Sequence, residues 1–234
     1  MAPVSEAREP ANEIKFLIDK TCARAIGEWA QAHIGPDPNA SDETGCYDTT
    51  SLYFDTENLD VLNQRGSYAR SKYRVRQYGG GGGAFLERKL RKSGVVTKRR
   101  SMIGIDDLSR LSYANAERGW NGYWFHRRIL ARRLRPVCQV SYSRLARVTE
   151  TQTGPLRLTM DRELLAHRTG DLRFDHGAKG IALSETQPIL ELKFRLEMPA
   201  LFNRLIEEFS LSPATVSKYR MAAAALGISE LSPG

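Results

Sequence analysis

Charged and apolar residues alternate in several short segments of this sequence, which is the pattern of a β-strand with two different faces. Because residues i and i+2 of a strand point the same way, each segment gathers its charges on one face. The charges recur as Glu-x-Lys or Arg-x-Arg pairs, as in Glu13-Ile14-Lys15 and Arg74-Val75-Arg76. Arginine and lysine bind phosphate groups and carboxylates bind Mg²⁺ or Mn²⁺, so these faces indicate phosphate chemistry with a divalent metal.

A sheet that exposes one face to water shows the same alternation, and this simpler interpretation suffices for any single strand. The whole set favours another arrangement, because amphipathic helices at about 20–33, 108–133 and 199–226 need an apolar surface to cover. If these helices cover the apolar faces of a curved sheet, the charged faces line its concave interior. Like charges in such an interior are costly, so a polyanion and a cation are needed to complete it.

The interior would then contain two sets of candidate ligands. The predicted phosphate ligands are Lys15, Arg74, Arg76, Lys89, Lys98, Arg144, Arg157, Lys193 and Lys218. The predicted ligands of Mg²⁺ or Mn²⁺ are Glu13, Glu87, Asp161 and Glu191. The sequence therefore predicts an anion site with metal-binding carboxylates, spread over most of the strands.

The secondary structure expected from the pattern is rich in antiparallel strands. Strands are expected at 13–18, 51–56, 68–78, 84–90, 95–102, 136–147, 156–164 and 188–194. A helix is expected at 20–33, another from Asp106 to about Arg133, and two more at 199–209 and 212–227. In the last of these, Ser212 and Pro213 have the residue types of an N-cap and a first helical position.

These elements predict one domain of the α+β class. The expected architecture is an antiparallel β-barrel tunnel with a charged lumen, flanked by amphipathic helices. The domain is expected to span residues 12–228, between flexible tails at 1–11 and 229–234. The five glycines at 79–83 are interpreted as a hairpin connection, because a strand follows them where a phosphate-binding loop would be followed by a helix.

The composition points to a polyanionic partner. The 234 residues are 41% hydrophobic and carry a net charge of +8, which suits nucleic acid, anionic lipid or a phosphate-rich small molecule. The three cysteines form no C-x-x-C motif and the four histidines have no ligand spacing, so a zinc site is not indicated. The N-terminus lacks an apolar signal-peptide stretch, and no segment has the roughly 18 apolar residues of a membrane span, so a cytoplasmic location is expected.

Nine short motifs follow one another at strand spacing. They are E-x-K-F at 13–16, SLYFDT at 51–56, R-x-R-x-Y at 74–78, FLERK at 85–89, TKRR at 97–100, SYSR at 141–144, R-x-T-x-D at 157–161, LELKF at 190–194 and SKYR at 217–220. Together they resemble the VTC domain, the polyphosphate polymerase branch of the triphosphate tunnel metalloenzymes in the CYTH-like superfamily. The resemblance covers residues from about 12 to 226.

The resemblance implies a transferase that moves the γ-phosphoryl group of ATP onto a growing polyphosphate chain, with Mn²⁺ or Mg²⁺. Arg74 and Arg76 resemble the pair that holds the terminal phosphates of the nucleotide, and Lys218 resembles a basic residue that reaches into the tunnel. These three are the predicted catalytic residues. Other matches to phosphate ligands are Lys15, Lys89, Lys98, Arg144 and Arg157, and Glu191 matches a metal-binding glutamate.

Two departures from the related families affect the expected activity. Tunnel triphosphatases and class IV adenylate cyclases begin with E-x-E-x-K, whereas this chain has Ala11 at the first glutamate position. The loss of one carboxylate favours transfer to phosphate over hydrolysis, although a triphosphatase and a catalytically silent polyphosphate-binding module remain alternatives. The segment Thr215-Val216 also lacks a lysine that the resemblance leads one to expect near the tunnel mouth.

Two basic runs leave other partners open. The segment RKLRKSGVVTKRR at 88–100 suits a nucleic acid, but its strand alternation argues against a basic helix or tail, so no nucleic acid is expected. The second run is Arg127, Arg128, Arg132, Arg133 and Arg135. It is interpreted first as a solvated helix face, with contact to the product chain, a membrane or a membrane partner as the alternative. The oligomeric state stays open.

Overall fold

The structure is a computed structural model that describes residues 12–38, 40, 44–79, 81–92, 95–183 and 187–228. The flexible tails predicted at 1–11 and 229–234 lie outside the described residues, as do Gly80 and Ser93-Gly94, the latter between the strands expected at 84–90 and 95–102. No helix in the described ranges has the length and apolar character needed to cross a membrane.

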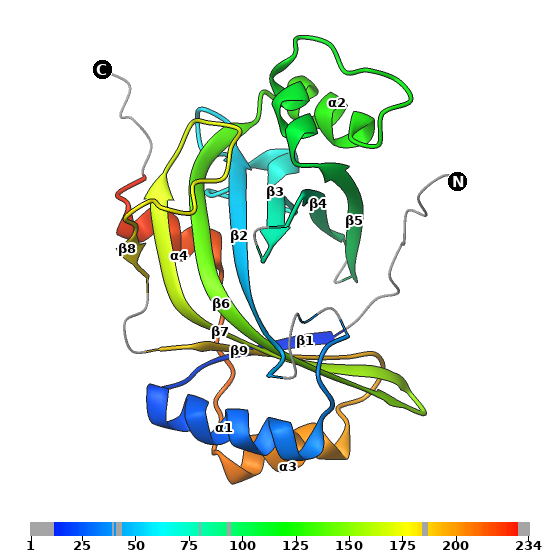
Figure 1. The fold of residues 1–234 in the computed structure, drawn as a ribbon, viewed down its shortest axis with the longest axis vertical. Helices are drawn as coiled ribbons and strands as arrows, with labels where there is room; N and C mark the ends of the chain where they lie inside the picture. The colour runs from blue at the N-terminus through cyan, green and yellow to red at the C-terminus, as the bar shows by residue number, and fades with distance from the viewer. Residues whose placement is uncertain are drawn as a thin grey trace.

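One antiparallel sheet organises the described chain (Figure 1). Its strands are β1 (Asn12–Leu17), β2 (Cys46–Asp55), β3 (Ser71–Tyr78), β4 (Gly83–Lys92), β5 (Val95–Gly104), β6 (Arg135–Thr151), β7 (Gly154–Arg168), β8 (Ile181–Ala182) and β9 (Ile189–Phe194). They pair in the order β1-β9-β7-β6-β2-β3-β4-β5, and β8 pairs with β7. The prediction of an α+β fold built on antiparallel strands is confirmed.

The described sheet is strongly curved but has two ends. In the part of the chain that the structure describes, no backbone ladder joins β1 to β5, so the expected barrel is not closed by hydrogen bonds. Strands β2, β6 and β7 bend along their length, which brings β1 and β9 opposite β3, β4 and β5 (Figure 1). A tunnel-like space between these two halves therefore replaces the regular barrel that the alternation suggested.

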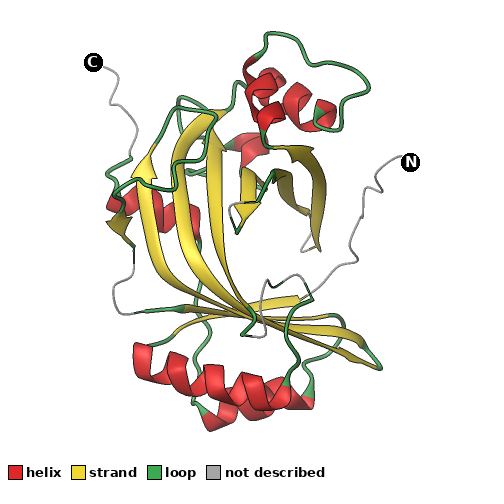
Figure 2. Cartoon of the chain, in the orientation of Figure 1, coloured by secondary structure: helices red, strands yellow, loops and turns green. Residues whose placement is uncertain are grey.

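Helices cover the outer, apolar faces of the sheet (Figure 2). Helices α1 (Lys20–His33) and α3 (Ala200–Glu208) bury one core against β1, β7 and β9, with Ile26, Leu192 and Phe202 fully buried. A second core forms on the other half of the sheet, where α2 (Tyr123–Ala131) and the 3₁₀ helices η1 (Gly66–Tyr68) and η2 (Asp106–Ser112) lie. Helix α4 (Lys218–Ala225) contributes to this core from the inner face, where Tyr219 stacks on Tyr53 of β2. The outer faces are thus apolar and covered, and the charged strand faces line the interior beside α4.

Helix α1 begins and ends where the sequence predicts it, at residues 20 and 33. The Asp19 carboxylate accepts a hydrogen bond of 2.7 Å from the Cys22 backbone N–H, which satisfies a free donor of the first turn. The glycine run at 79–83 joins β3 to β4, as predicted, with Gly79 in the left-handed region at φ +57°. Both features depend on local residues alone.

The single helix expected from Asp106 to about Arg133 is wrong. The chain forms η2 at Asp106–Ser112 and α2 at Tyr123–Ala131, separated by ten residues without regular structure. Gly119 in this connection has φ +89°, which a helix cannot accommodate. The apolar positions on either side belong to two short elements that pack into the same core.

The helix start predicted at Ser212-Pro213 is also wrong. Pro213 forms a β-bridge with Phe16, and the Ala214 N–H donates a 2.7 Å hydrogen bond to the Lys15 carbonyl oxygen. The segment therefore runs along the free edge of β1, where its backbone groups gain partners that a helix start would leave unused. Helix α4 begins only at Lys218, with Ser217 as its N-cap.

Candidate functional site

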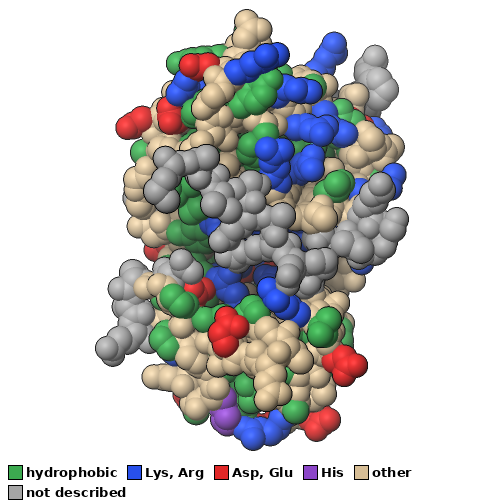
Figure 3. Space-filling model, turned by 90° about the vertical axis from the view of Figure 1, so that its right-hand side faces the viewer, with side chains coloured by type: hydrophobic (Ala, Val, Ile, Leu, Met, Phe, Trp, Pro, Cys, Tyr) green, Lys and Arg blue, Asp and Glu red, His purple; other side chains and the backbone are tan. Residues whose placement is uncertain are grey.

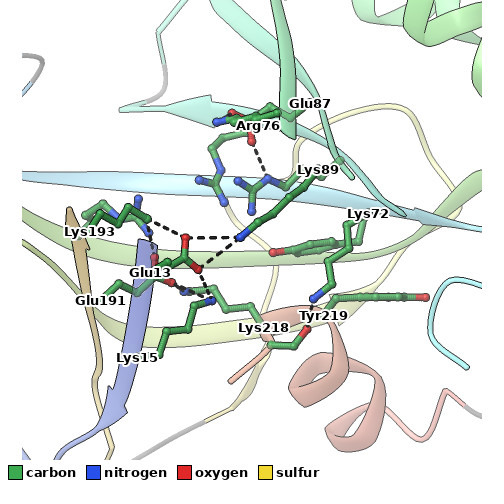
Figure 4. Close-up of a pocket in the computed structure, with 15 residues that line it drawn as sticks. Glu13, Lys15, Lys72, Arg76, Glu87, Lys89, Glu191, Lys193, Lys218 and Tyr219 are labelled. Atoms are coloured by element: carbon green, nitrogen blue, oxygen red, sulfur yellow. Dashed lines mark hydrogen bonds and ion pairs between the residues drawn. The ribbon is translucent and has the colours of Figure 1, made fainter. Parts of the chain in front are cut away.

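Fifteen residues line a pocket on the inner face of the sheet, with a volume of about 730 Å³ including its open mouth (Figure 4). They are Glu13, Lys15, Tyr53, Lys72, Arg74, Arg76, Glu87, Lys89, Lys98, Arg144, Glu191, Lys193, Ser217, Lys218 and Tyr219. Nine of them are lysine or arginine and three are glutamate, so the lining carries a large positive excess. A lining with this charge suits a polyanionic ligand.

Strand register explains why these side chains converge. Lys72, Lys89 and Lys98 are direct cross-strand neighbours on β3, β4 and β5, and so share one face of the sheet. On the opposite wall, Lys15 pairs with Glu191 and Glu13 with Lys193 in the ladder between β1 and β9. The period-2 alternation of each strand thus becomes a continuous charged surface only after the strands are paired.

The wall formed by β1 and β9 holds two carboxylates among lysines. Lys193 Nζ lies 2.8 Å from Glu191 Oε2, and Lys15 Nζ lies 3.1 Å from Glu13 Oε1. Lys89 Nζ reaches across the pocket from β4 to Glu13 Oε1 at 3.4 Å (Figure 4). Burial alone would raise the pKa of Glu13, but Lys193, Lys15 and Lys89 outweigh it and lower this pKa to about 2. Glu13 is therefore ionised at neutral pH.

The wall formed by β3, β4 and β5 is organised around Glu87, which is 2% exposed. Its carboxylate lies 2.6 Å from Arg74 Nε and 2.5 Å from Lys98 Nζ, with Arg100 Nε at 3.4 Å. Burial opposes ionisation, but the pKa of Glu87 still lies well below its usual value because Arg74 and Lys98 flank it. Glu87 thus holds several cations together on this wall.

Arg76 differs from Arg74 and Arg144 because no carboxylate of the described chain lies within ion-pair distance of it. Its Nε donates a 3.0 Å hydrogen bond to Ser51 Oγ, and within the described ranges it forms no ion pair. The side chain is 3% exposed and lines the pocket. Burial would lower the pKa of Arg76, but Tyr142, Tyr78 and Glu87 hold this pKa well above its usual value. The guanidinium therefore stays charged and, without an ion-pair partner, is available to an anionic ligand.

A buried ion-pair cluster fixes Lys218 at the back of the pocket. Asp161 is fully buried and accepts hydrogen bonds from Arg144 Nε at 2.6 Å and Nη2 at 2.8 Å. Lys218 Nζ lies 2.5 Å from Asp161 Oδ2 and 3.2 Å from Glu191 Oε1. Burial would lower the pKa of Lys218, but Asp161 and Glu191 raise it above its usual value, so this ammonium group stays charged.

Tyr219 anchors the start of α4 next to Lys218. Its hydroxyl donates a 2.6 Å hydrogen bond to the buried Asp55 carboxylate, and its ring stacks on Tyr53 at 5.3 Å between centroids. Asp55 also accepts hydrogen bonds from the backbone N–H groups of Thr56, Val61 and Leu62. The loop after β2 and the helix α4 are therefore tied to one carboxylate, which sets the depth to which Lys218 reaches.

Replacing Tyr219 by phenylalanine removes one donor from the buried Asp55 carboxylate. Hydrogen bonds to charged groups contribute about 1.5–3 kcal/mol, so we expect the free energy of unfolding in urea to fall by this amount. The affinity for tripolyphosphate should fall as well, because Lys218 loses its neighbouring anchor. Tyr113→Phe is the control, since this tyrosine is 54% exposed, and it should change neither quantity.

The comparisons with known proteins agree with this geometry. A family model described as the VTC domain matches residues 10–227. The chain belongs to the VTC domain family. A search of curated protein sequences finds no match to this VTC domain. The family predicted from the nine motifs is confirmed.

Two solved structures share the fold of this VTC domain. A putative adenylate cyclase from Bacillus halodurans is 18% identical, with a TM-score of 0.56 over 89% of this chain and 94% of that chain. The putative adenylyl cyclase HpAC1 from Hippeastrum, which has a dominant triphosphatase activity, is 15% identical. Its TM-score is 0.51, over 93% of this chain and 97% of that chain. At these identities the similarity concerns the fold.

Most of the residues predicted for the site of this VTC domain line the pocket. Those that do are Glu13, Lys15, Arg74, Arg76, Glu87, Lys89, Lys98, Arg144, Glu191, Lys193 and Lys218. Asp161 lies behind them, buried beneath Lys218. Arg157 is not in the lining, because its Nη2 binds Asp37 Oδ2 at 2.6 Å and the Tyr47 hydroxyl at 3.0 Å.

Four lining residues were not predicted, namely Tyr53, Lys72, Ser217 and Tyr219. Lys72 could have been found, because it continues the i, i+2 alternation of Arg74 and Arg76 by one more step. Tyr53 and Tyr219 carry no such signal. They face the pocket only because α4 stacks on β2, which local sequence does not reveal.

Two of the four predicted metal ligands suit a divalent cation in the VTC domain. Glu13 and Glu191 both line the pocket and share Lys15 and Lys193 as neighbours. Mg²⁺ is commonly held by one or two carboxylates together with water and substrate phosphates, so this pair fits such an ion. Within the described ranges, no group of three or more His, Cys, Asp or Glu side chains is close enough to hold a metal without substrate.

The other two carboxylates have surroundings that differ from those of a metal ligand. Glu87 is enclosed by Arg74, Lys98 and Arg100, and Asp161 by Arg144 and Lys218. Lysines surround Glu13 and Glu191 as well, so the difference is one of access. Asp161 lies behind the lining and Glu87 is 2% exposed, whereas the Glu13 side chain is 22% exposed. Metal binding by Glu87 and Asp161 stays a prediction, and the cation site proposed for Glu13 and Glu191 does not include them.

Proposed function

We propose that this VTC domain binds ATP and inorganic polyphosphate in the pocket and transfers the γ-phosphoryl group of ATP onto the end of the chain. The observation that carries the proposal is the excess of nine cationic over three acidic lining residues, among them Arg76, which forms no ion pair in the described chain. Two anionic reactants can meet only where their charges are neutralised together. A pocket with this excess supplies that neutralisation.

The residues of the pocket would act by position and charge. Arg74 and Arg76 project from neighbouring positions of one face of β3 and would hold the oxygens of the transferred phosphoryl group. Lys218 would approach from α4, and Lys89 and Lys193 would hold the acceptor chain. Phosphoryl transfer needs little covalent help from the protein, and a phosphate acceptor is already anionic, so no strong general base is required.

Glu13 and Glu191 would hold Mg²⁺ or Mn²⁺ together with phosphate oxygens of the substrate. When bound, the ion would neutralise part of the charge on the reacting phosphates. Lys15 and Lys193, which contact both carboxylates, would then be free to bind phosphate oxygens instead. Of the three remaining predicted ligands, Lys98 and Arg144 line the same pocket and would hold further phosphates, whereas Arg157 lies outside the lining.

The deciding experiment is incubation of the purified protein with ATP and Mn²⁺ or Mg²⁺. We expect ADP together with acid-labile polyphosphate chains. Orthophosphate as the only phosphate product would assign a triphosphatase, and pyrophosphate with cyclic AMP would assign a cyclase. Tight polyphosphate binding without turnover would leave a binding module. Ala11 stands where related hydrolases have a carboxylate, which favours the formation of ADP and polyphosphate over hydrolysis.

Binding should take up protons above neutral pH. Burial, followed by the nearby cations Lys15 and Lys89, lowers the pKa of Lys72 to about 8. Burial also lowers the pKa of Lys98 to about 8, although Glu87 opposes it. Bound phosphate stabilises the charged form of both lysines and so raises each pKa. We therefore expect affinity for tripolyphosphate to fall as pH rises through about 8.

Calorimetry at pH 8.5 in buffers of different ionisation enthalpy tests this prediction. The wild type should take up more protons on binding than Lys72→Met, and the two should not differ at pH 6.5. The stability of the free protein changes with pH in the opposite direction to the affinity. Because the folded-state pKa of Lys72 is below its usual 10.5, the folded state binds fewer protons between about 8 and 10.5, and its stability rises with pH there. Equal proton uptake by wild type and variant at pH 8.5 would contradict the prediction.

A further inference from the structure

A second group of cations lies on the outer face of the same strands that form the pocket. Arg88 on β4 and Arg99 on β5 are directly opposite each other in the ladder, and both point away from the interior. The Arg99 guanidinium lies 4.5 Å from the ring centroid of Trp124 on α2, and Arg128 follows Trp124 by one helical turn. We call Arg88, Arg99 and Arg128 the outer arginine cluster.

The outer arginine cluster has no carboxylate to neutralise it. Within the described ranges none of its three members forms an ion pair, and Arg88 Nε is buried without a hydrogen-bond partner. Like charges directly opposite each other destabilise a sheet, so the Arg88–Arg99 pair costs stability in the empty protein. Burial, and then the charges of Arg88 and Arg128, lower the pKa of Arg99 from its usual value. The cluster therefore lacks an anion.

The surroundings of the cluster support a phosphate ligand. Trp124 Nε1 donates a 2.9 Å hydrogen bond to Ser101 Oγ, which fixes the indole ring. The fixed ring in turn packs against the Arg99 guanidinium and orders the Arg99 side chain. Guanidinium groups bind phosphate oxygens with two parallel hydrogen bonds, so ordered arginines suit a phosphate chain. Since Trp124 is covered by Arg99 and bonded to Ser101, it is not free to insert into a bilayer.

The position of the cluster relates it to the pocket. Lys89 and Lys98 face the interior, and their chain neighbours Arg88 and Arg99 face outward, so only the thickness of the sheet separates the two groups. Strand β5 is an end strand of the described sheet and pairs with β4 alone. Lys and Arg side chains gather on the upper half of the face shown in Figure 3, where β5 and α2 lie. A chain that leaves the pocket past β5 would meet them.

We propose that the outer arginine cluster binds the part of a long polyphosphate chain that extends beyond the pocket. The inference rests on the proposed function, because it assigns a second contact to the same polyanion. It assigns the basic segment at 88–100 two roles, with Lys89 and Lys98 in the pocket and Arg88 and Arg99 outside it. The cluster should thus affect only ligands longer than the pocket.

The test compares the double variant Arg88→Gln/Arg99→Gln with the wild type in binding to tripolyphosphate and to polyphosphate of about 100 phosphates. Loss of two charged phosphate contacts should weaken binding of the long chain about 10-fold or more at low salt, and reduce its salt dependence. Binding of tripolyphosphate should change less than about twofold. The matched control is Arg135→Gln/Arg173→Gln, which removes the same charge at side chains that are 59% and 78% exposed.

Three outcomes would overturn the proposal: unchanged affinity of the double variant for the long chain, an equal loss in the control, or a parallel loss for tripolyphosphate. A loss of binding to vesicles with anionic lipid, with long-chain affinity unchanged, would assign the cluster to a membrane surface instead. A failure of the proposed transferase function would give a different result from a failure of the outer arginine cluster. If the wild type makes no polyphosphate but the double variant still loses long-chain affinity selectively, the cluster stands and the transferase assignment falls.

Discussion

Arg76→Met is expected to reduce phosphoryl transfer by about 10²–10³-fold, the usual effect of removing one preorganised donor from a reacting oxygen. The free energy of unfolding should fall by no more than about 1.5 kcal/mol, because one hydrogen bond is lost and no ion pair is broken. Arg76 is 3% exposed, its charge is not paired with a carboxylate in the described chain, and its only hydrogen bond is to Ser51 Oγ. Methionine keeps the unbranched apolar stem and removes the guanidinium that would bind the phosphate.

Activity and stability measured together distinguish a ligand-binding charge from a structural one. Arg147 is the matched control, because it is 4% exposed, lies outside the pocket and, like Arg76, forms no ion pair in the described chain but donates one hydrogen bond, to the Thr44 carbonyl oxygen at 3.1 Å. Arg147→Met should lower stability by a similar amount and leave turnover within about twofold. Arg76→Lys should recover only part of the activity, since an ammonium group lacks the guanidinium fork. Full turnover by Arg76→Met would exclude the pocket as the reaction site.

Asp161→Asn is expected to lower the free energy of unfolding by about 3–5 kcal/mol, as found when one member of a buried ion pair is removed. Asp161 is fully buried and neutralises both Arg144 and Lys218. The asparagine has the same shape, so the loss comes from the charge rather than from packing. Two cations would then remain buried side by side, each repelling the other. Equilibrium unfolding in urea measures the effect.

An exposed carboxylate with an arginine partner provides the control for Asp161. Asp171 lies 3.5 Å from Arg173 and is 66% exposed, so Asp171→Asn should change stability by less than about 1 kcal/mol. Tripolyphosphate should raise the melting temperature of Asp161→Asn more than that of the wild type, because the bound anion replaces the missing charge. Wild-type stability in Asp161→Asn, with a selective loss of the Mn²⁺ or Mg²⁺ requirement, would instead support Asp161 as a metal ligand.

Local sequence was sufficient to predict the elements whose structure depends on neighbouring residues. Helix α1 begins and ends at the predicted residues because Asp19 caps it and its apolar positions repeat at helical spacing. Eight of the nine described strands were predicted, with ends that differ by up to five residues, because alternation over five or more positions is a strong signal. The two-residue strand β8 was not predicted. The same alternation showed that Lys15, Arg74 and Glu87 would leave the apolar cores and face a common interior.

Tertiary contacts overrode local preference in the helical regions that were predicted wrongly. The apolar residues at 106–133 repeat with helical spacing, yet Gly119 adopts a positive φ and the chain forms two short helices. The pair Ser212-Pro213 has the types of a helix start, but the free edge of β1 binds this segment as extended backbone. The edge strand that decides this is about 200 residues away in the sequence, so local propensity cannot account for it.

The sequence by itself determined the family and which charges share the inner face, because side-chain direction in a strand has a period of two residues. Only the tertiary structure decided which of those charges neutralise one another. Arg157 is paired with Asp37, 120 residues away, and Lys218 with Glu191 and Asp161, whereas Arg76 has no such partner in the described chain. The number of charges is set by composition, but their availability to a phosphate ligand depends on distances that form only when the strands pair.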